Sequence, residues 1–411
     1  MLLIYMFLYV FSLSIPVFYH SAFLVGVLAS IHCLFVHDKR VFKLTKYQFT
    51  YFSAFLIGYI IIGGIVVLKG TNDFTFFKTY TNSFLSALCA VPLVVLFNEK
   101  FKDETPFYIM EYLFKIFLIQ SIIILLVLFI PQLKPLVTTF QRDPDLANEL
   151  DQFSNGLRTN ALSGGLFFGL SLSFALALIL FVYYEFIINF RLNIFKVLLF
   201  IIVNIGLICT GRFGFVYVLC ILPLLLSMRF KNKLRFISFV FFMVVLFSAL
   251  FFMLYQLSPY VKNTYDNIVY PYAFEFLSNY NSSGSFDTSS TNQLASMYDV
   301  KITYNTWLFG DGIYTGTDGL YYQHTDVGYL RLLLLGGGVL NAYFIIFTIL
   351  TLFPLLRLKA HKGSALFFSI LLLFILSQFK GEAMVTLVQL NNMCFLICSS
   401  IILSKRKTEY E

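Results

Sequence analysis

The chain of 411 residues is dominated by apolar side chains: 59% of its residues are hydrophobic, only 12% are charged, and its mean hydropathy is +0.82. Soluble domains are about 45–50% apolar and about 25% charged, so this composition excludes a soluble globular protein and predicts a polytopic membrane protein. The net charge of +8 would suit nucleic acid or anionic lipid, but its distribution indicates membrane topology instead, so we expect no nucleic-acid partner.

Apolar segments alternate with polar connections along the whole chain. A membrane helix needs about 20 apolar residues, and twelve spans are predicted on this basis. They lie near residues 1–18, 21–36, 47–68, 79–97, 108–130, 162–184, 195–210, 213–228, 236–257, 339–356, 364–379 and 383–403. The expected fold class is an all-α polytopic membrane protein with about 12 transmembrane helices, in a single integral membrane domain over residues 1–411.

Lysine and arginine are distributed unequally between alternate connections. One set of connections holds 18 of these residues and the other holds 10. Because cytoplasmic loops carry the excess of Lys and Arg, the richer set is interpreted as cytoplasmic. An even number of spans then places both termini in the cytoplasm.

Two connections on the opposite, outer side are long, at residues 131–161 and 258–325. Loops of this length are usually functional or disordered. The second holds 10 of the 26 tyrosines and the only tryptophan, Trp307. Aromatic rings stack on the apolar faces of sugars, so Trp307, Tyr321 and Tyr322 are candidate substrate-binding residues. The alternative is an aromatic belt that packs the loop on the membrane surface.

Two arginines stand at the outer ends of predicted spans. Arg212 lies between two apolar runs and beside glycines, at a depth where an arginine is costly unless it is paired or faces water. Arg158 closes the first long loop just before a glycine-bearing span. A guanidinium binds phosphate through two parallel hydrogen bonds, which makes both residues candidate anion ligands. The alternatives are a snorkelling anchor for Arg212 and a juxtamembrane arginine without a specific role for Arg158.

His324 and Asp326 mark the exit of the second long loop. A histidine can take a proton from an attacking sugar hydroxyl at neutral pH, and Asp326 could orient it or act as the base itself. The alternatives are a histidine bonded to the backbone and a helix-capping role for Asp326. Asn204 is a further candidate contact near Arg212. Lys380 and Glu382 flank the last outer turn and are further candidates, with a simple pair between them as the alternative.

The sequence lacks nucleotide-binding and metal-binding signatures. It has no P-loop, no HExxH motif and no outer-side cluster of His, Cys and Asp with the spacing of metal ligands. The six cysteines all lie in apolar runs, so no disulfide framework is expected. We therefore expect no metal and no cofactor. A polymerisation at the outer face must then use a leaving group already attached to its donor, and arginines can stabilise the charge of a lipid-linked diphosphate.

Four short motifs follow one another on the predicted outer side. They are a basic residue before a Gly-rich span (157–165), an arginine at a turn between spans (210–212), a Leu-Phe-Gly-Asp-Gly block (308–312), and a run from His324 to the glycines at 336–338. With these motifs, the span number and the large late outer loop, the chain resembles the superfamily of O-antigen polymerases (Wzy-type) and O-antigen ligases.

Members of this superfamily use glycans linked to undecaprenyl diphosphate, as donor and as acceptor. The resemblance implies that Arg158 and Arg212 bind the diphosphate, and that His324 activates an acceptor hydroxyl that displaces undecaprenyl diphosphate with inversion. Where family members carry an arginine before the Leu-Phe-Gly block, this chain has Lys301, a point charge that would not reproduce a bidentate contact. The resemblance also implies the bacterial inner membrane, a periplasmic active site, a role in lipopolysaccharide or capsule biosynthesis, and a chain-length regulator protein as partner.

Two alternatives to a polymerase remain open. A ligase, which transfers the finished chain to the lipid A core, is not separated from a polymerase by the physics of the sequence. We favour the polymerase because a composition rich in Phe, Ile, Asn and Tyr resembles those divergent proteins. A polysaccharide flippase or other transporter would show internal repeats and broken helices near mid-membrane. Here the predicted spans are almost uncharged at their centres, which favours an enzyme with polar outer loops.

Overall fold

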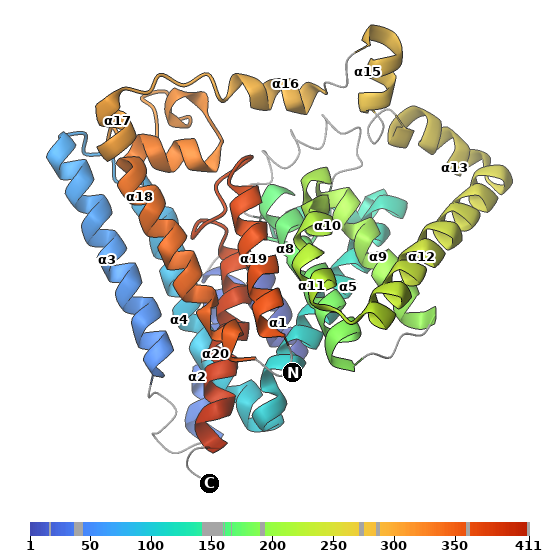
Figure 1. The fold of residues 1–411 in the computed structure, drawn as a ribbon, viewed down its shortest axis with the longest axis horizontal. Helices are drawn as coiled ribbons and strands as arrows, with labels where there is room; N and C mark the ends of the chain where they lie inside the picture. Colours follow the sequence, from blue (N-terminus) through green and yellow to red (C-terminus); the bar gives the residue numbers. More distant parts are fainter. Residues whose placement is uncertain are drawn as a thin grey trace.

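The computed structural model is almost entirely helical (Figure 1). It describes the chain apart from residues 16–17, 37–43, 142–158, 160, 166, 190–193, 271–274, 285–287, 359–361 and 409–411. The main helices are α1 (Leu2–Phe11), α2 (Ser21–Val36), α3 (Lys46–Lys69), α4 (Thr75–Phe101), α5 (Thr105–Phe129), α8 (Phe167–Tyr183), α9 (Ile194–Thr210), α10 (Tyr217–Cys220), α11 (Leu222–Ser227), α12 (Phe230–Leu257), α18 (Gly328–Leu352), α19 (Gly363–Ser377) and α20 (Val388–Thr408).

Shorter elements connect these helices. The hairpin β1 (Ser14–Ile15) and β2 (Tyr19–His20) is antiparallel and follows α1. The other short elements are α6 (Lys134–Thr138), α13 (Pro259–Thr264), α15 (Glu275–Ser283), α16 (Ser289–Ser296) and α17 (Tyr304–Phe309), the 3-10 helices Lys102–Glu104, Pro131–Leu133, Arg212–Val216, Tyr322–His324 and Phe353–Arg357, and the π-helices Tyr184–Asn189 and Tyr265–Val269.

The expected all-α membrane class is confirmed at the level of length and composition. Within the described ranges, five helical stretches are long and apolar enough to cross a membrane. They are Lys46–Lys69, Thr75–Phe129, Phe167–Asn189, Phe230–Leu257 and Gly328–Arg357. The second stretch holds two helices, α4 and α5, joined by a 3-10 turn. Further apolar helices are shorter, so the count of twelve spans stays a prediction.

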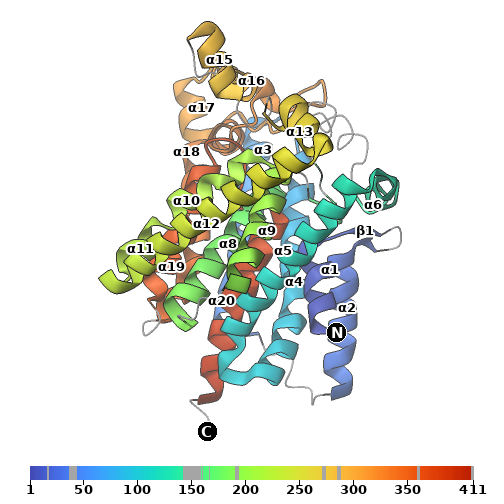
Figure 2. The same cartoon turned by 90° about the vertical axis from the view of Figure 1, so that its right-hand side faces the viewer.

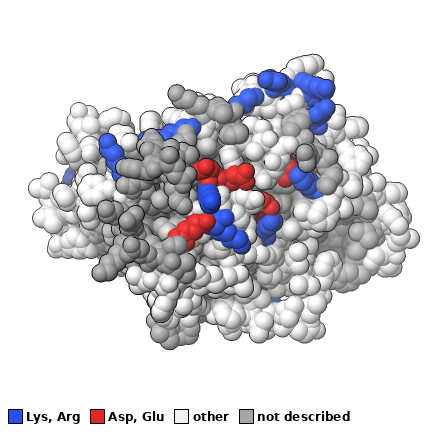
Figure 3. All heavy atoms as spheres, turned by 90° about the horizontal axis from the view of Figure 1, so that it is seen from below, with Lys and Arg blue, Asp and Glu red and all other residues white. Residues whose placement is uncertain are grey.

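The connections between helices lie at two ends of the bundle (Figures 1 and 2). The elements α13, α15, α16 and α17 gather at the upper end, and the C-terminus lies at the lower end. The long stretch 258–325, expected as a loop, therefore contains the short helices α13, α15, α16 and α17 over the upper end. Figure 3 shows the lower end, where acidic and basic side chains gather near the middle and further Lys and Arg lie toward the edge.

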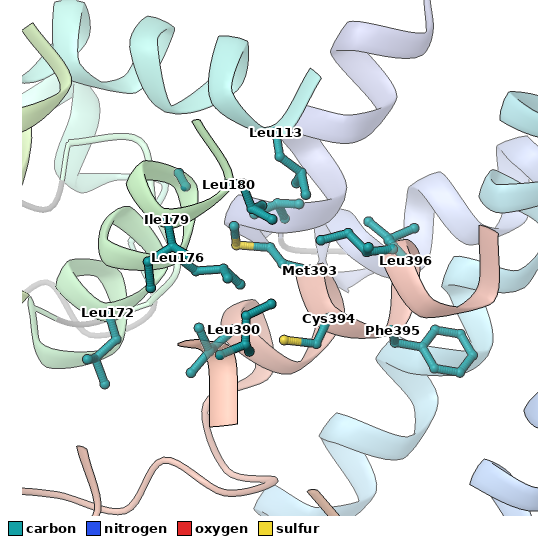
Figure 4. Packing of buried hydrophobic residues seen from close by; sticks show 14 of the residues in the cluster. Leu113, Leu172, Leu176, Ile179, Leu180, Leu390, Met393, Cys394, Phe395 and Leu396 are labelled. Carbon is teal, nitrogen blue, oxygen red and sulfur yellow. The ribbon is translucent and has the colours of Figure 1, made fainter. Parts of the chain in front are cut away.

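The hydrophobic core is centred on α8, whose most apolar stretch is 89% buried. Its sequence is apolar on all sides and has small residues among the leucines, which is typical of a helix surrounded by other helices. In Figure 4, Leu176 and Leu180 of α8 point toward Leu390 and Met393 of α20, and Leu113 of α5 lies beside them. This core fixes the positions of the segments that begin α8 and α20, both of which border the candidate site.

Helix α18 begins at Gly328, well before the predicted span at 339–356, and it is broken at its glycines. Gly336 and Gly337 have non-helical backbone angles, with φ of 68° at Gly337. The break lets carbonyl groups of α18 accept hydrogen bonds from another segment: Asp311 N donates to Leu334 O (2.6 Å) and Gly312 N to Leu335 O (3.1 Å). The break at the glycines therefore allows α18 to bind the segment that follows α17.

The segment 310–325 is also held by the connection between α3 and α4. The Asp73 carboxylate accepts hydrogen bonds from Tyr314 N (2.6 Å) and Thr315 N (2.8 Å). Thr71 Oγ1 donates to Gly312 O at 2.6 Å. Burial opposes ionisation of Asp73, but the hydrogen bonds from Thr75, Thr315 and Tyr314 outweigh it together and lower its pKa. The segment is thus an anchored cap over the upper end of the bundle.

Candidate functional site

A cavity of about 730 Å³ lies beneath this cap. Its walls come from the start of α8, the turn after α9, the cap, the first turn of α18 and the connection from α19 to α20. All of these segments belong to the upper end (Figure 1). Its charged lining residues are Arg212, Arg331, Lys380, Asp326 and Glu382. A volume of this size suits a bound small molecule or part of a larger one.

Glycines before α8 bring backbone close to the cavity wall. A Cβ atom on Gly164 would lie 2.0 Å from Ser12 O, and one on Gly165 would lie 2.5 Å from Gln389 Oε1. A side chain at Gly164 would therefore displace the end of α1, whereas one at Gly165 would require the Gln389 side chain to move. The Gly-rich pattern that the sequence showed before this span has a steric reason.

Arg331 is the most constrained charged residue of the cavity. Its side chain is only 6% exposed, and its Nη1 lies 3.2 Å from Oε2 of Glu382, whose side chain is 2% exposed. The guanidinium carbon lies 3.6 Å from the ring centroid of Tyr321 and 4.1 Å from that of Tyr314. Two aromatic rings and one carboxylate thus hold the planar guanidinium in a fixed orientation.

Arg331 also carries unused donors. Its Nε and Nη2 atoms are buried and have no hydrogen-bond partner among the residues that the structure describes, and the same holds for Glu382 Oε1. A buried polar group without a partner costs about 1–3 kcal/mol, and more when it is charged. Arg331 lines the cavity, so its positive charge favours an anion there.

Protonation changes the charge balance of the cavity. Burial raises the pKa of Asp326, although Arg331 and Lys380 partly oppose this effect. Burial also raises the pKa of Glu382, against the opposing effects of Arg331 and of the Tyr314 hydroxyl, which donates to Glu382 Oε2 at 2.8 Å. Both carboxyl groups therefore accept protons more readily than usual, and even with both ionised the cavity lining holds three cations against two carboxylates. The cavity favours an anionic ligand.

Arg212 approaches the cavity from the turn after α9. Its Nη2 lies 3.4 Å from Glu275 Oε2 of α15, and both side chains are partly exposed, at 29% and 22%. Lys380 Nζ lies 5.3 Å from the ring centroid of Phe213, the residue that follows Arg212. Two cations from separate elements, Arg212 and Lys380, thus line the cavity together with Arg331.

The structure brings together some of the residues that the sequence predicted. Arg212, Asp326 and Tyr321 line the same cavity. Helix α18 has Val327 at its N-cap, without a side-chain capping bond, so Asp326 does not cap this helix. Arg158 lies outside the described residues.

His324 does not line the cavity. Its side chain is 70% exposed, and its Nε2 lies 3.5 Å from Oδ2 of Asp318 on the surface of the cap. The physical reason is a tight turn: Gln323 and His324 both have positive φ, at 53° and 54°, which reverses the chain just before Asp326. His324, to which the resemblance assigns the activation of the acceptor, therefore does not line the cavity that Arg212 lines.

The other predicted contacts also lie elsewhere. Trp307 is 55% exposed on α17. Lys301 contacts Gln323 through its backbone, with Lys301 N donating to Gln323 Oε1 at 2.9 Å. Tyr322 is absent from the cavity lining. Asn204 accepts a hydrogen bond from the Tyr217 hydroxyl at 2.8 Å, which joins α9 to α10. Its role in the described structure is therefore packing.

The buried pair of the cavity was not identified from the sequence. Arg331 lies in the run from His324 to the glycines at 336–338 but was assigned no role, and Glu382, a candidate that could pair with Lys380, instead pairs with Arg331. The signal for Arg331 was present, because it stands between leucines in an apolar run, where an arginine is costly unless it has a partner. The partner itself lies too far along the chain for sequence spacing to reveal it.

Comparisons of the chain with protein-family models, with curated proteins and with solved structures find no match. The geometry of the cavity is therefore the basis for a functional assignment.

Proposed function

We propose that this chain is a membrane glycosyltransferase that joins glycans carried on a polyprenyl diphosphate, as O-antigen polymerases do. The single observation that supports this most strongly is the buried Arg331, with two unused guanidinium donors at the wall of a cavity that also holds Arg212 and Lys380. Three cations on separate elements can surround the two phosphates of such a donor. The positive-inside interpretation of the sequence supports an outer face for this cavity, and the resemblance to O-antigen polymerases implies the periplasmic face of a bacterial inner membrane.

The diphosphate is the leaving group in this proposal. Arg331 contacts one phosphate through Nε and Nη2, in the parallel geometry that a guanidinium offers to two phosphate oxygens. Arg212 and Lys380 contact the other phosphate. The three positive charges stabilise the negative charge that develops as the bond between the sugar and the diphosphate breaks. Fixed charges in a water-poor site usually make the largest contribution to such catalysis.

Asp326 is the general base in this proposal. It lines the same cavity, and its raised pKa makes it a better proton acceptor than an exposed aspartate. The acceptor hydroxyl loses its proton to Asp326 and forms a bond to the anomeric carbon. The bond from that carbon to the diphosphate oxygen breaks, and the electron pair leaves with the lipid diphosphate. Attack from the face opposite the leaving group inverts the anomeric configuration.

Reconstitution tests the proposal directly. The full-length protein in liposomes receives a synthetic repeat unit on undecaprenyl diphosphate, and the products are measured by mass spectrometry. We expect glycans that lengthen by whole repeat units, with one lipid diphosphate released for each new bond. The control substrate carries the same glycan on a lipid monophosphate and gives no product.

Two results would contradict the proposal. Equal extension from the monophosphate control would remove the role of the diphosphate. Movement of the unchanged donor across the bilayer, without extension, would identify a transporter. A second reaction that contains a lipid A core acceptor distinguishes a ligase, which transfers glycan to the core instead of to another repeat unit.

A further inference from the structure

A second cavity, of about 300 Å³, lies at the other end of α18. Its walls come from the first three turns of α3, the end of α18, the 3-10 helix Phe353–Arg357 and Ile402 of α20. Arg331 stands in the first turn of α18, whereas this cavity borders Phe347, Leu350 and Thr351 in its last turns. The two cavities are therefore separate, and the second one belongs to the lower end of the bundle, where the C-terminus lies (Figure 1).

The cavity is a gap between α3 and α18. Helix α3 lies at the edge of the bundle, and only 33% of its most apolar stretch is buried. Near its upper end it is tied to the cap by Thr71, and near its lower end the Tyr47 hydroxyl donates to Thr351 O at 2.9 Å. Between these ties, Tyr51, Ala54 and Phe347 line the gap with apolar surface.

The mouth of the gap is cationic. Lys46 and Arg357 line it from the start of α3 and from the 3-10 helix after α18, and both are exposed. The hydroxyl-bearing Thr50 lines it beside them. Basic pockets between membrane helices bind the head groups of anionic lipids, because two cations complement one phosphate.

The surface around the gap is apolar. Phe49 is 66% exposed, Leu350 45% and Phe353 52%, so the helix faces beside the gap are those that lipid tails would cover. A cationic mouth over an apolar cleft matches a molecule with a phosphate head and a hydrocarbon tail. A free phosphate would use only the mouth.

We propose that this cavity binds an anionic phospholipid, with its phosphate between Lys46 and Arg357 and one acyl chain against Ala54 and Phe347. The bound lipid bridges the lower ends of α3 and α18. Because α3 also anchors the cap through Thr71 and Asp73, the lipid stabilises the helix on which the cap depends. This proposal does not rest on the proposed function, since it concerns the opposite end of the molecule.

Lipid titration of the purified full-length protein tests the proposal. Binding of phosphatidylglycerol and of phosphatidylcholine is measured by native mass spectrometry, for the wild type and for the variant Lys46→Gln/Arg357→Gln. Loss of two surface cations predicts roughly 30-fold weaker binding of the anionic lipid. The matched control is Lys100→Gln/Lys102→Gln, which removes two exposed cations at the same end but outside the cavity, and it binds as the wild type does.

A second variant separates the tail from the head group. Ala54→Phe fills the gap while both cations remain. We expect this variant to bind phosphatidylglycerol as weakly as the double charge variant does. Thermal unfolding of lipid-free samples identifies any variant that fails to fold, and the binding comparison uses the folded ones. Equal lipid binding by all variants would overturn the proposal. So would displacement of the lipid by inorganic phosphate alone, because the site would then recognise a free anion.

Discussion

The pairs Arg331–Glu382 and His324–Asp318 have similar distances between their charged groups, but they differ in how far they are buried. Arg331 and Glu382 are 3.2 Å apart with side chains 6% and 2% exposed, whereas His324 and Asp318 are 3.5 Å apart with side chains 70% and 45% exposed. An exposed pair contributes about 0–1 kcal/mol, because water screens both charges. A buried pair that loses one partner destabilises the fold by about 3–5 kcal/mol. Burial therefore decides which pair belongs to a functional site.

The largest expected effect concerns the base. Asp326→Asn keeps the shape of the side chain but removes the proton acceptor, and we expect glycan transfer to fall by about 10²–10⁴-fold. The measurement is the rate of chain extension in liposomes. The control is Asp318→Asn, which changes the exposed pair and leaves the rate unchanged.

The pH dependence of the wild type sharpens this prediction. The base must be ionised, so the rate rises as pH rises through the raised pKa of Asp326. The effect on stability has the opposite sign. Between the ordinary aspartate pKa and the raised pKa of Asp326, the folded protein holds a proton on Asp326 that the unfolded chain has lost. The free energy of unfolding therefore falls as pH rises through this range. A rate that falls with rising pH in this range would contradict Asp326 as the base.

The second effect concerns the buried pair. Glu382→Gln leaves the Arg331 guanidinium buried without its counter-charge, and we expect the free energy of unfolding to fall by about 3–5 kcal/mol. The measurement is denaturant unfolding in detergent. The double variant Arg331→Gln/Glu382→Gln removes both charges and regains most of this loss. If the double variant were less stable than the single one, the two charges would not stabilise each other.

The third effect concerns the anchor of the cap. Asp73→Asn weakens the hydrogen bonds from Tyr314 N and Thr315 N, and we expect a loss of about 1–2 kcal/mol in stability. Folding lowers the pKa of Asp73. The ionised carboxylate therefore stabilises the fold fully above the ordinary aspartate pKa, and this stabilisation disappears as pH falls through the pKa of Asp73 in the folded protein. Thermal unfolding of both proteins at neutral and acidic pH checks this: the difference between them should shrink in acid. A constant difference would exclude a role of the charge.

The sequence predicted the class of the fold and part of the site. The fold class followed from composition, and the site residue followed from the cost of a charged side chain among apolar ones. Composition fixed the membrane class, and the cost of an arginine in an apolar run identified Arg212. The same argument applied to Arg331, but the glycines at 336–338 suggested that the helix began after them. The structure shows that these glycines instead break a longer helix, because the carbonyls freed at Leu334 and Leu335 bind the cap.

His324 and Glu382 show what the sequence could not provide. The direction of His324 depends on the left-handed backbone of a single turn, which no residue type in that turn requires. The partner of Glu382 depends on the packing of α18 beside the connection from α19 to α20. Both are properties of the folded chain and not of local spacing.

The smallest expected effect concerns the exposed pair. His324→Gln removes an imidazole that is 70% exposed on the surface of the cap, so stability should change by no more than about 0.5 kcal/mol. The rate of chain extension should remain within about threefold of the wild type, since no catalytic proton passes through this residue. The same liposome assay measures it. A large loss of rate would place the histidine at the reacting hydroxyl and contradict the geometry of the cavity.

The most direct test compares the two pairs in one assay. Liposomes that contain the wild type, His324→Gln or the charge-neutral double variant Arg331→Gln/Glu382→Gln receive the same synthetic undecaprenyl-diphosphate repeat unit. Thermal unfolding first establishes that all three are folded. The account predicts long glycan from the wild type and from His324→Gln, and none from the double variant. Normal extension by the double variant, or loss of extension only in His324→Gln, would contradict it.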